Sequence, residues 1–258
     1  MVSKGDKKLN SISAKILFSS GLDIFFPPRC PITDEAVDGP TLISAKGWNE
    51  LVFIDRPSCI GCGIPFETFL GEGALCGACL ANPIGLDEVR AAIVYNEAAH
   101  KLIVAFKHSD QSNLSPLLGN WLWRAGNPMI ESASVIAPVP LHRSRLFSRR
   151  FNQSSLLAKY VAHKAGVGFS PQLLVRNRPT SPQQALSAEA RRRNVAGAFE
   201  VHRNEIASLE GRNVILVDDV LTTGSTLKAC CSALRKAGAK RVSALVVARV
   251  VKSGEDAI

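Results

Sequence analysis

The sequence predicts an α/β protein: a doubly wound parallel sheet preceded by a small module built around four cysteines. Strands and helices alternate from Val89 onward, as in parallel sheets with helices on both faces. Before that point lie two Cys-x-x-Cys pairs, 59–62 and 76–79, and a short polar join at 83–88 follows them. The three expected parts are an N-terminal helical segment at 1–26, a metal-binding module at 27–86 and the main α/β domain at 87–258.

The composition is that of an ordinary globular protein, with 46% hydrophobic residues in a chain of 258, and the net charge is +9. Such a basic balance favours polyanionic partners, either nucleic acid or a polyphosphorylated substrate, without choosing between them. The polar N-terminus is not followed by the apolar core of a secretory signal. No apolar run reaches the ~18 residues of a membrane span. We therefore expect a cytoplasmic protein.

Residues 11–26 carry apolar side chains at roughly helical spacing, and Pro27 and Pro28 end the pattern. A helix that packs against the protein's own body is favoured over one that lies on a membrane surface. The reason is that Lys15 is the only cation in this segment and Gly21 interrupts it.

Each Cys-x-x-Cys pair predicts a tight turn that aims two thiolates at one point, with glycine supplying backbone freedom. In a cytosolic protein such pairs indicate metal binding rather than disulfides. Two of these turns form a tetrahedral zinc site, and because protein fills all four positions the zinc should be structural. The predicted ligands are Cys59, Cys62, Cys76 and Cys79.

Cys30 stands apart from these pairs. A further Cys-x-x-Cys pair would need a cysteine where Thr33 stands. We therefore interpret Cys30 as half of a decayed or unused cysteine turn, or knuckle, of the kind that each Cys-x-x-Cys pair forms. A role for Cys30 as a fifth zinc ligand or as a reactive thiol is disfavoured. Cys230 and Cys231 fall on the helix after the glycine loop and are expected in the core.

Apolar periodicity divides the main domain into alternating elements. Expected strands cover 89–95, 135–140, 173–175, 198–201, 214–217 and 241–250, and expected helices cover 98–108, 114–125 and 152–165. A turn is expected at 109–113, and a further helix follows the glycine loop and stops at Gly238. Trp121 and Trp123 could stack nucleobases, but at helical positions tryptophans more often belong to a core or an interface.

A basic loop follows the strand at 135–140, at the strand end where ligands bind in open α/β sheets. Its arginines suit a pyrophosphate, because a planar guanidinium pairs with phosphate oxygens in bidentate fashion. A solvated basic face is the alternative. The candidate residues are His142, Arg143, Arg145, Arg149 and Arg150.

Residues 177–194 are polar, with two prolines, paired glutamines and a run of arginines at 191–193. A segment of this kind beside a phosphate site is typical of a mobile lid. The arginines either close on a polyphosphate or face water, and the run alone does not choose between these roles.

The stretch at 213–226 carries the chemistry on which the prediction of function depends. A short β-branched apolar run is followed by Asp218 and Asp219, then by a loop of small residues and a helix. Backbone N–H groups and the positive end of the helix dipole converge at such a loop and form an anion site. Gly224 allows close backbone approach, and the neighbouring hydroxyls add donors. Two acids that can accept hydrogen bonds from ribose, next to a phosphate cradle, would suit a sugar 5-phosphate.

The letters VILVDDVLTTGST closely resemble the phosphoribosyl pyrophosphate (PRPP) motif of type I phosphoribosyltransferases. In that family the paired acids hold the ribose 2- and 3-hydroxyls, and the Thr/Gly loop holds the 5-phosphate. The resemblance implies a type I phosphoribosyltransferase-like sheet. The other functional interpretation, a Walker B strand of an ATPase, needs a Gly-x-x-x-x-Gly-Lys-Ser/Thr loop upstream, and the sequence has none.

Further stretches occur in one order with this motif: the two cysteine pairs, AFKHSD, PVPLHRSRLFSRRFNQS and PTSPQQALSAEARRRNVAGAF. Together they resemble the ComF family of bacterial phosphoribosyltransferase-like proteins, which is linked to natural competence for DNA uptake. The resemblance extends from about Cys30 to Val250. That family often has an extra Cys-x-x-Cys pair near its N-terminus, and Thr33 interrupts the pair here.

The resemblance implies a role for each site residue. The PRPP-binding set, used with Mg²⁺, would be Asp218, Asp219, Leu221, Thr222, Thr223, Gly224, Ser225 and Thr226. The pyrophosphate loop and the flexible loop at 178–193 would supply Pro140, Leu141, His142, Arg143, Arg149, Arg150, Arg191 and Arg192. The four cysteines of the two pairs would form the zinc ribbon. No catalytic side chain is assigned, because His142 is the only histidine near the site and a lone histidine is more often structural.

Three functions are compatible with these features. The first is PRPP binding in the service of DNA uptake or single-strand DNA processing, with single-stranded DNA and competence or DNA-processing proteins as partners. The second is an active phosphoribosyltransferase of nucleotide metabolism that acts on a nucleobase or amine. The third is a nucleic-acid-binding adaptor with a regulatory PRPP site. Purine-salvage relatives usually carry an acid where Thr222 stands, which weakens a 6-oxopurine acceptor and leaves the acceptor open.

Overall fold

The computed structural model describes residues 27–39, 42–108, 112–141, 151–177 and 197–251. The chain forms two compact units, Met1–Glu50 and Leu51–Ile258, and each is described by itself. The helix expected at 11–26 lies outside the described residues, and so do the loop at 142–150 and the arginine run at 191–193. The domain boundaries placed at 26/27 and 86/87 stay predictions.

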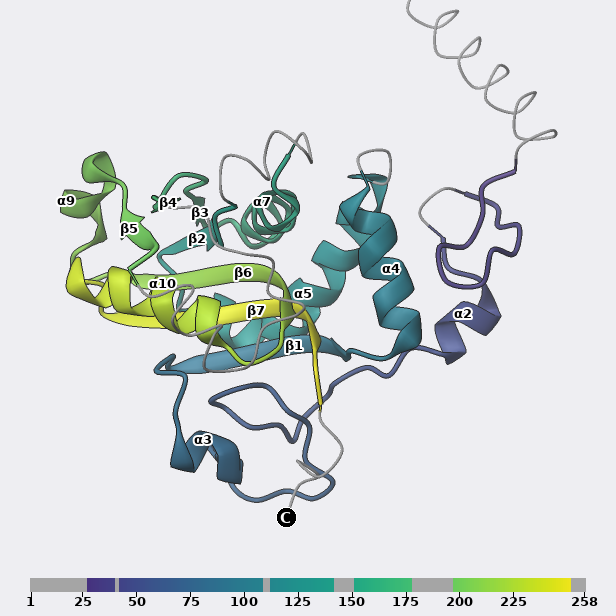
Figure 1. Cartoon of the computed structure of the whole chain (residues 1–258), viewed down its shortest axis with the longest axis horizontal. Coiled ribbons are helices and arrows are strands. Elements are labelled where there is room, and N and C mark those ends of the chain that lie inside the picture. The colour runs from purple at the N-terminus through teal and green to yellow at the C-terminus, as the bar shows by residue number, and fades with distance from the viewer. Residues whose placement is uncertain (1–26, 40–41, 109–111, 142–150, 178–196, 252–258) are drawn as a thin grey trace, which may run out of the picture. The chain divides into compact units, whose positions relative to one another are not determined.

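A parallel sheet forms the centre of the second unit (Figure 1). Its strands are β1 (Glu88–Val94), β2 (Val135–Pro138), β3 (Gly168–Phe169), β6 (Asn213–Leu221) and β7 (Arg241–Arg249). Their order is β1-β7-β6-β2-β3, and every pairing in this sheet is parallel. The predicted parallel sheet is therefore confirmed.

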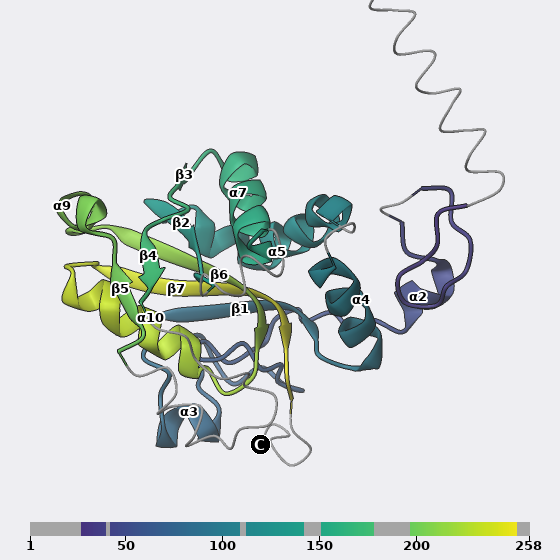
Figure 2. The same cartoon turned by 45° about the horizontal axis from the view of Figure 1, so that its top comes forward.

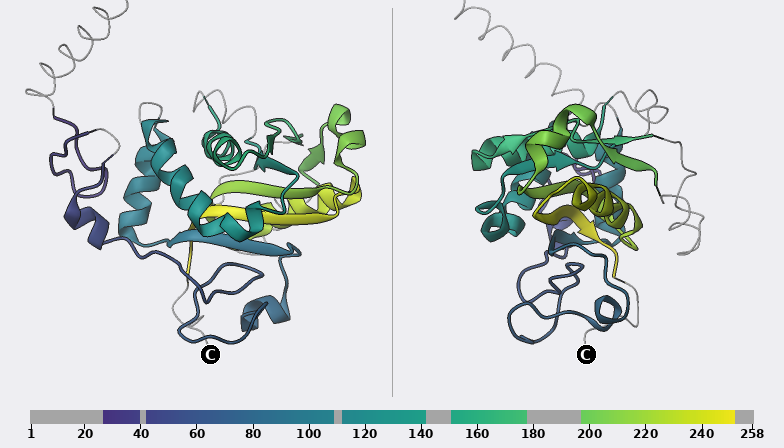
Figure 3. Two further views of the ribbon diagram at one scale, coloured as in Figure 1. Left: turned by 180° about the vertical axis from the view of Figure 1, so that it is seen from behind. Right: turned by 90° about the vertical axis from the view of Figure 1, so that its left-hand side faces the viewer.

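Helices cover both faces of this sheet (Figure 2 and Figure 3). The main helices are α4 (Glu97–Lys107), α5 (Ser115–Ile130), α7 (Gln153–Ala165) and α10 (Ser225–Lys236). α5 packs on one face, where a Cβ on Gly126 would lie 2.4 Å from a methyl of Leu245 in β7. On the other face, Leu227 and Leu234 of α10 pack against Ala244 of β7 and its neighbours. This arrangement confirms the doubly wound fold.

Two elements of this sheet and its helices are longer than predicted. β6 continues past the apolar run through Asp218 and Asp219 to Leu221, because β7 is equally long and supplies hydrogen-bond partners along the whole strand. α5 does not end at residue 125 but continues to Ile130, although Pro128 lies in its last turns. Met129 and Ile130 are buried, and this burial holds the extra turn in place.

Two short strands form a separate pair outside the main sheet. β4 (Leu174–Arg176) and β5 (Phe199–Val201) pair with each other in antiparallel fashion and flank the segment at 178–196. Apolar periodicity predicts each strand but not their separate pairing. The remaining elements are short: α2 (Ala45–Asn49), α3 (Gly77–Ala81), η1 (Ser112–Leu114), η3 (Arg203–Glu205) and α9 (Ile206–Leu209). Within the described ranges, no helix combines the length and apolar character that crossing a bilayer requires.

Candidate functional site

The two adjacent acids lie in the last third of β6, just before the small-residue loop. The Asp218 carboxylate accepts two hydrogen bonds at one oxygen: 3.1 Å from the Ser154 hydroxyl and 2.9 Å from the backbone N–H of Asp219. Burial and the neighbouring Asp219 charge raise the pKa of Asp218 to about 7. The structure thus keeps a half-buried carboxyl group that titrates close to neutral pH.

Asp219 has a different partner. The ammonium group of Lys107, the last residue of α4, lies 2.7 Å from the Asp219 carboxylate. Both side chains are largely shielded, with 27% and 19% of their surfaces exposed. The same Lys107 charge opposes the upward shift in the pKa of Asp218. Lys107 belongs to the AFKHSD stretch but was not among the predicted site residues.

The start of α7 links three parts of this site. The Asn152 side chain caps the helix by accepting from the Ser154 N–H, and its amide donates to the carbonyl of Val139 at 3.0 Å. The Gln153 amide donates to the carbonyl of Lys107 at 3.2 Å. Ser154 reaches Asp218, as described above. Residues 152–154 therefore connect the ends of β2, α4 and β6 through hydrogen bonds. Sequence reasoning did not assign this role to them.

The small-residue loop turns from β6 into α10 at Gly224. This residue has φ +75°, in the left-handed region that favours glycine, and it has no side chain to occupy the first-turn N–H groups of the helix. The hydroxyls of Thr223 and Ser225 lie 2.9 Å apart and share a hydrogen bond. The loop therefore presents backbone N–H groups and hydroxyls at a helix N-terminus, which is the geometry of an anion site.

The other predicted site residues separate into three groups. Leu221 is buried, so its side chain belongs to the core and only its backbone can serve a ligand. Pro140 and Leu141 line a cavity of about 990 Å³ together with Asn152 and residues of the β4–β5 pair. Outside the described residues lie His142, Arg143, Arg149, Arg150, Arg191 and Arg192.

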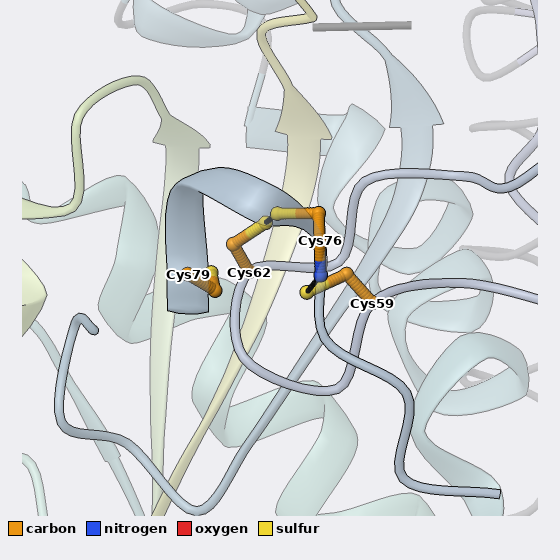
Figure 4. Close-up of side chains that lie close together, drawn as sticks. All are labelled: Cys59, Cys62, Cys76 and Cys79. Atoms are coloured by element: carbon orange, nitrogen blue, oxygen red, sulfur yellow. Dashed lines mark hydrogen bonds between the residues drawn. The ribbon is translucent and has the colours of Figure 1, made fainter. Parts of the chain in front are cut away.

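The four predicted zinc ligands come together (Figure 4). One sulfur atom from each of Cys59, Cys62, Cys76 and Cys79 lies within 4.8 Å of the others. The sulfurs of Cys62 and Cys76 are 3.7 Å apart, close to the ~3.8 Å that tetrahedral geometry with Zn–S bonds of about 2.3 Å requires. The N–H of Cys76 donates to the sulfur of Cys59 at 3.2 Å, a contact that favours a thiolate. These donors fit a structural zinc ion.

One buried arginine joins this cysteine cluster to the small-residue loop. Arg249 closes β7 and is 7% exposed. Its Nε donates to the carbonyl of Cys62 at 3.0 Å, and its Nη1 donates to the carbonyl of Thr222 at 3.1 Å. The sequence signal for this role was a charged residue directly after the apolar run 244–248, and sequence reasoning did not use it.

Cys230, Cys231 and Trp121 behave as core residues. Cys230 and Cys231 lie on the buried face of α10, as predicted. Trp121 is buried and packs edge-on against Phe53, with ring centroids 5.0 Å apart, so packing is its role. The ammonium group of Lys164 lies over the ring of Trp123, 4.3 Å from its centroid.

Known families and proteins match both parts of the chain. Residues 21–80 match the family described as a double zinc ribbon domain, and residues 152–257 match the phosphoribosyl transferase domain. The chain is 31% identical to the DNA utilization protein YhgH of Salmonella typhi over 199 residues, which cover 75% of this chain and 84% of that protein. It is 32% identical to competence protein F of Haemophilus influenzae over 200 residues, covering 75% and 85% of the two chains. Over 92 residues it is 37% identical to an adenine phosphoribosyltransferase of Maricaulis maris, covering 36% and 50%.

Proposed function

The chain belongs to the ComF family of phosphoribosyltransferase-like proteins, and from that membership we propose that it binds PRPP with Mg²⁺ at the carboxyl end of β6. The observation that carries the proposal is the adjacency of two kinds of group. The carboxylates of Asp218 and Asp219 accept hydrogen bonds, and the loop from Thr222 to Ser225 donates them. Ribose hydroxyls are donors and a 5-phosphate is an acceptor, so ribose 5-phosphate matches both.

The acids serve the ribose and the metal. Mg²⁺ prefers oxygen ligands, which Asp218 and Asp219 supply. When bound with the pyrophosphate, Mg²⁺ contributes positive charge toward the leaving group. In the free protein Lys107 neutralises Asp219, and a bound ligand would compete with Lys107 for this carboxylate.

The pyrophosphate would lie toward the end of β2. Pro140 and Leu141 stand at that end and line the large cavity. His142 and the arginines that follow it in sequence add the positive charge that a pyrophosphate needs. The partners proposed with this site are single-stranded DNA and DNA-processing proteins, in keeping with the names of the relatives.

Zinc has a structural part in this proposal. Four cysteine sulfurs fill a tetrahedral site and leave no open position for a substrate, so the ion holds the ribbon and takes no part in chemistry. Arg249 then connects the ribbon to the phosphate loop.

A second candidate function is transfer of ribose 5-phosphate to a nucleobase or amine. The cavity of about 990 Å³ favours it, because it gives an acceptor room beside the proposed pyrophosphate site. In such a transfer the anomeric carbon loses its bond to pyrophosphate and forms a bond to the acceptor nitrogen, whose proton leaves to solvent. Positioning and electrostatic stabilisation would supply most of the acceleration.

Calorimetry tests the first proposal. Mg²⁺–PRPP is titrated into the wild-type chain and into a variant with both Asp218→Asn and Asp219→Asn, which keeps the shape of the side chains and removes the charge. We expect heat of binding in the wild type and none in the variant. Equal affinity in the two proteins would overturn the site, and no binding in the wild type would favour the nucleic-acid adaptor.

Pyrophosphate release then separates binding from transfer. A panel of nucleobases and amines is added to the wild-type chain with Mg²⁺–PRPP. Release that depends on one acceptor would support the second function, whereas tight PRPP binding without release would leave the first alone.

A further inference from the structure

The described part of the first unit repeats the metal-binding ribbon of the second unit in the spacing within each pair of ligand positions. Cys30 and Thr33 are spaced like Cys59 and Cys62. Further along, Ser44 and Gly47 are spaced like Cys76 and Cys79. Only the first of these four positions keeps its cysteine.

The backbone of the first knuckle repeats in detail. In the first unit the N–H groups of Cys30, Asp34 and Val37 donate to the carbonyls of Glu35, Cys30 and Pro28, at 2.8, 2.9 and 2.9 Å. In the second unit those of Cys59, Gly63 and Phe66 donate to the carbonyls of Ile64, Cys59 and Pro57, at 2.8, 2.8 and 2.9 Å. The donors and acceptors are therefore related by one constant offset in the sequence.

Two special features of this knuckle repeat as well. Asp34 has φ +61° and is the only non-glycine residue with positive φ in the described ranges, and its counterpart Gly63 has φ +70°. An isolated β-bridge joins Arg29 to Ala36, and the equivalent bridge joins Ser58 to Pro65. An aspartate in this conformation is tolerated but costs free energy. Such a turn is therefore retained only where the surrounding fold requires it.

The second half of the ribbon repeats too. Ser44 precedes the five-residue helix α2, and Cys76 precedes the five-residue helix α3. Both N-cap residues are extended, with φ −61° and ψ 156° at Ser44 and φ −73° and ψ 160° at Cys76. The residue that would be the fourth ligand, Gly47, lies on α2 as Cys79 lies on α3.

A chain of hydrogen bonds occupies the place of the metal in the first unit. The N–H of Gly47 donates to the Ser44 hydroxyl at 3.1 Å, the hydroxyls of Ser44 and Thr33 lie 2.8 Å apart, and the Thr33 hydroxyl donates to the Glu35 carboxylate at 3.0 Å. The one cysteine, Cys30, is buried. Its sulfur lies 3.0 Å from where a Cβ on Gly47 would be, so the space of the missing side chain has closed.

We propose that residues 28–39 and 42–50 belong to a second zinc ribbon that has lost its metal and folds without it. Two hydroxyls, a glycine and a single thiol do not make a zinc site, because zinc in proteins is bound by cysteine, histidine or carboxylate. The hydroxyl chain and the buried Cys30 hold the two halves together instead. The chain thus binds one zinc ion, although the family it matches at 21–80 is described as a double ribbon.

Metal analysis of the full chain tests the stoichiometry. We expect one zinc per chain in the wild type, one in Cys30→Ser and none in Cys59→Ser. Two zinc ions in the wild type, or loss of zinc on replacing Cys30, would overturn the proposal.

Hydrogen exchange tests whether the first ribbon folds without metal. A chelator is added to the wild-type chain, and the amides of Cys30, Asp34 and Val37 are compared with their counterparts Cys59, Gly63 and Phe66. We expect only the second set to lose protection by a large factor. Equal loss of protection in both sets would refute metal-independent folding.

Restoring the ligands tests the lost site directly. The variant Thr33→Cys, Ser44→Cys and Gly47→Cys should bind a second zinc ion, because the backbone already has the ribbon geometry. Thr33→Cys alone serves as the matched control and should stay at one. If the triple variant folds, as its circular dichroism shows, yet binds one zinc, the geometric argument is wrong; if it does not fold, the exchange experiment still decides.

Discussion

Arg249 and Cys62 are joined by a hydrogen bond of 3.0 Å from the guanidinium Nε to the carbonyl oxygen, across 187 positions of sequence. The same guanidinium also donates to the carbonyl of Thr222. The bond therefore connects the first cysteine knuckle of the ribbon to the loop proposed to hold the 5-phosphate. We infer from this link that the order of the small-residue loop depends on the order of the ribbon.

We expect Arg249→Met to weaken PRPP binding while leaving the proposed ligand contacts in place. The substitution removes the guanidinium that donates to the carbonyls of Cys62, Leu221, Thr222 and Val250 in a buried position, and such a loss costs roughly 1–3 kcal/mol of stability. A less ordered loop loses more conformational entropy when it binds the ligand. We therefore expect the Kd for PRPP to rise by about tenfold, equivalent to about 1.4 kcal/mol. Thermal unfolding and calorimetry with Mg²⁺–PRPP measure the two effects.

Arg241→Met is the control for this prediction. Arg241 stands at the exposed start of the same strand, so its replacement removes a charge of the same kind far from the loop. The zinc content of both variants shows whether the ribbon survives. Wild-type PRPP affinity in a zinc-loaded Arg249→Met protein would disprove the link.

The local features of the site could be predicted because each depends on residues that are adjacent in the sequence. The apolar run of β6, the turn at Gly224 and the start of α10 are adjacent in sequence, and each cysteine pair forms its turn within four residues. The alternation of strands and helices was likewise enough for a parallel sheet, since such a sheet needs crossover helices.

The contacts that hold the site together could not be predicted, because they join residues far apart in sequence. Ser154 reaches Asp218 across 64 positions, and Lys107 meets Asp219 from another helix. Neither the polarity of the residues nor their spacing in the sequence shows which serine will contact Asp218 or which lysine will contact Asp219. The same holds for the end of β6: that Asp218 and Asp219 belong to the strand follows from the length of its partner β7.

We expect Asp218→Asn to stabilise the free protein above neutral pH while abolishing PRPP binding. The pKa of Asp218 is about 7 in the folded chain, above its unfolded value near 3.8. The folded state therefore holds a proton that the unfolded state has lost, and the wild type loses stability as pH rises from about 4 to about 7. Asparagine cannot ionise, and its oxygen can still accept from Ser154 and from the Asp219 N–H.

Thermal unfolding at two pH values measures this effect. At pH 4.5 the variant and the wild type should unfold at nearly the same temperature. At pH 8 the variant should be more stable by about 1–3 kcal/mol, a rise in Tm of several degrees for a chain of this size. A variant that is less stable than wild type at pH 8 would contradict the assigned protonation.

We expect Lys107→Met to move the pH at which PRPP binding sets in to a higher value. The Lys107 charge lowers the pKa of Asp218, so its removal lets that pKa rise further and delays ionisation. Binding requires ionised carboxylates, so affinity at pH 7 should fall more than affinity at pH 8.5. Calorimetry of both proteins across this range, with the same Mg²⁺–PRPP stock, cancels the titration of the ligand itself.

Lys101→Met is the matched control for Lys107. Lys101 lies on the same helix and pairs with Glu97 at 3.2 Å on the surface. Because surface pairs of this kind contribute little, its loss should leave the pH profile of binding unchanged. Identical profiles for Lys107→Met and Lys101→Met would remove Lys107 from the site.

We expect Gly224→Ala to be unusually costly, because two penalties coincide there. The residue has φ +75°, and an added Cβ would lie 2.7 Å from the terminal methyl of Ile84. The left-handed backbone alone costs alanine roughly 1–2 kcal/mol, and the contact adds to it.

Gly166→Ala isolates the backbone cost, since Gly166 has φ +67° with nothing within 4 Å of its added Cβ. Adding Ile84→Ala to Gly224→Ala should remove the cost of the contact with Ile84 but not the cost of the left-handed backbone. Denaturant unfolding of the single and double variants measures this coupling. If Gly224→Ala costs no more than Gly166→Ala, Ile84 does not press on the loop. If the double variant unfolds as easily as the sum of the singles predicts, the segment after the ribbon does not brace the phosphate loop.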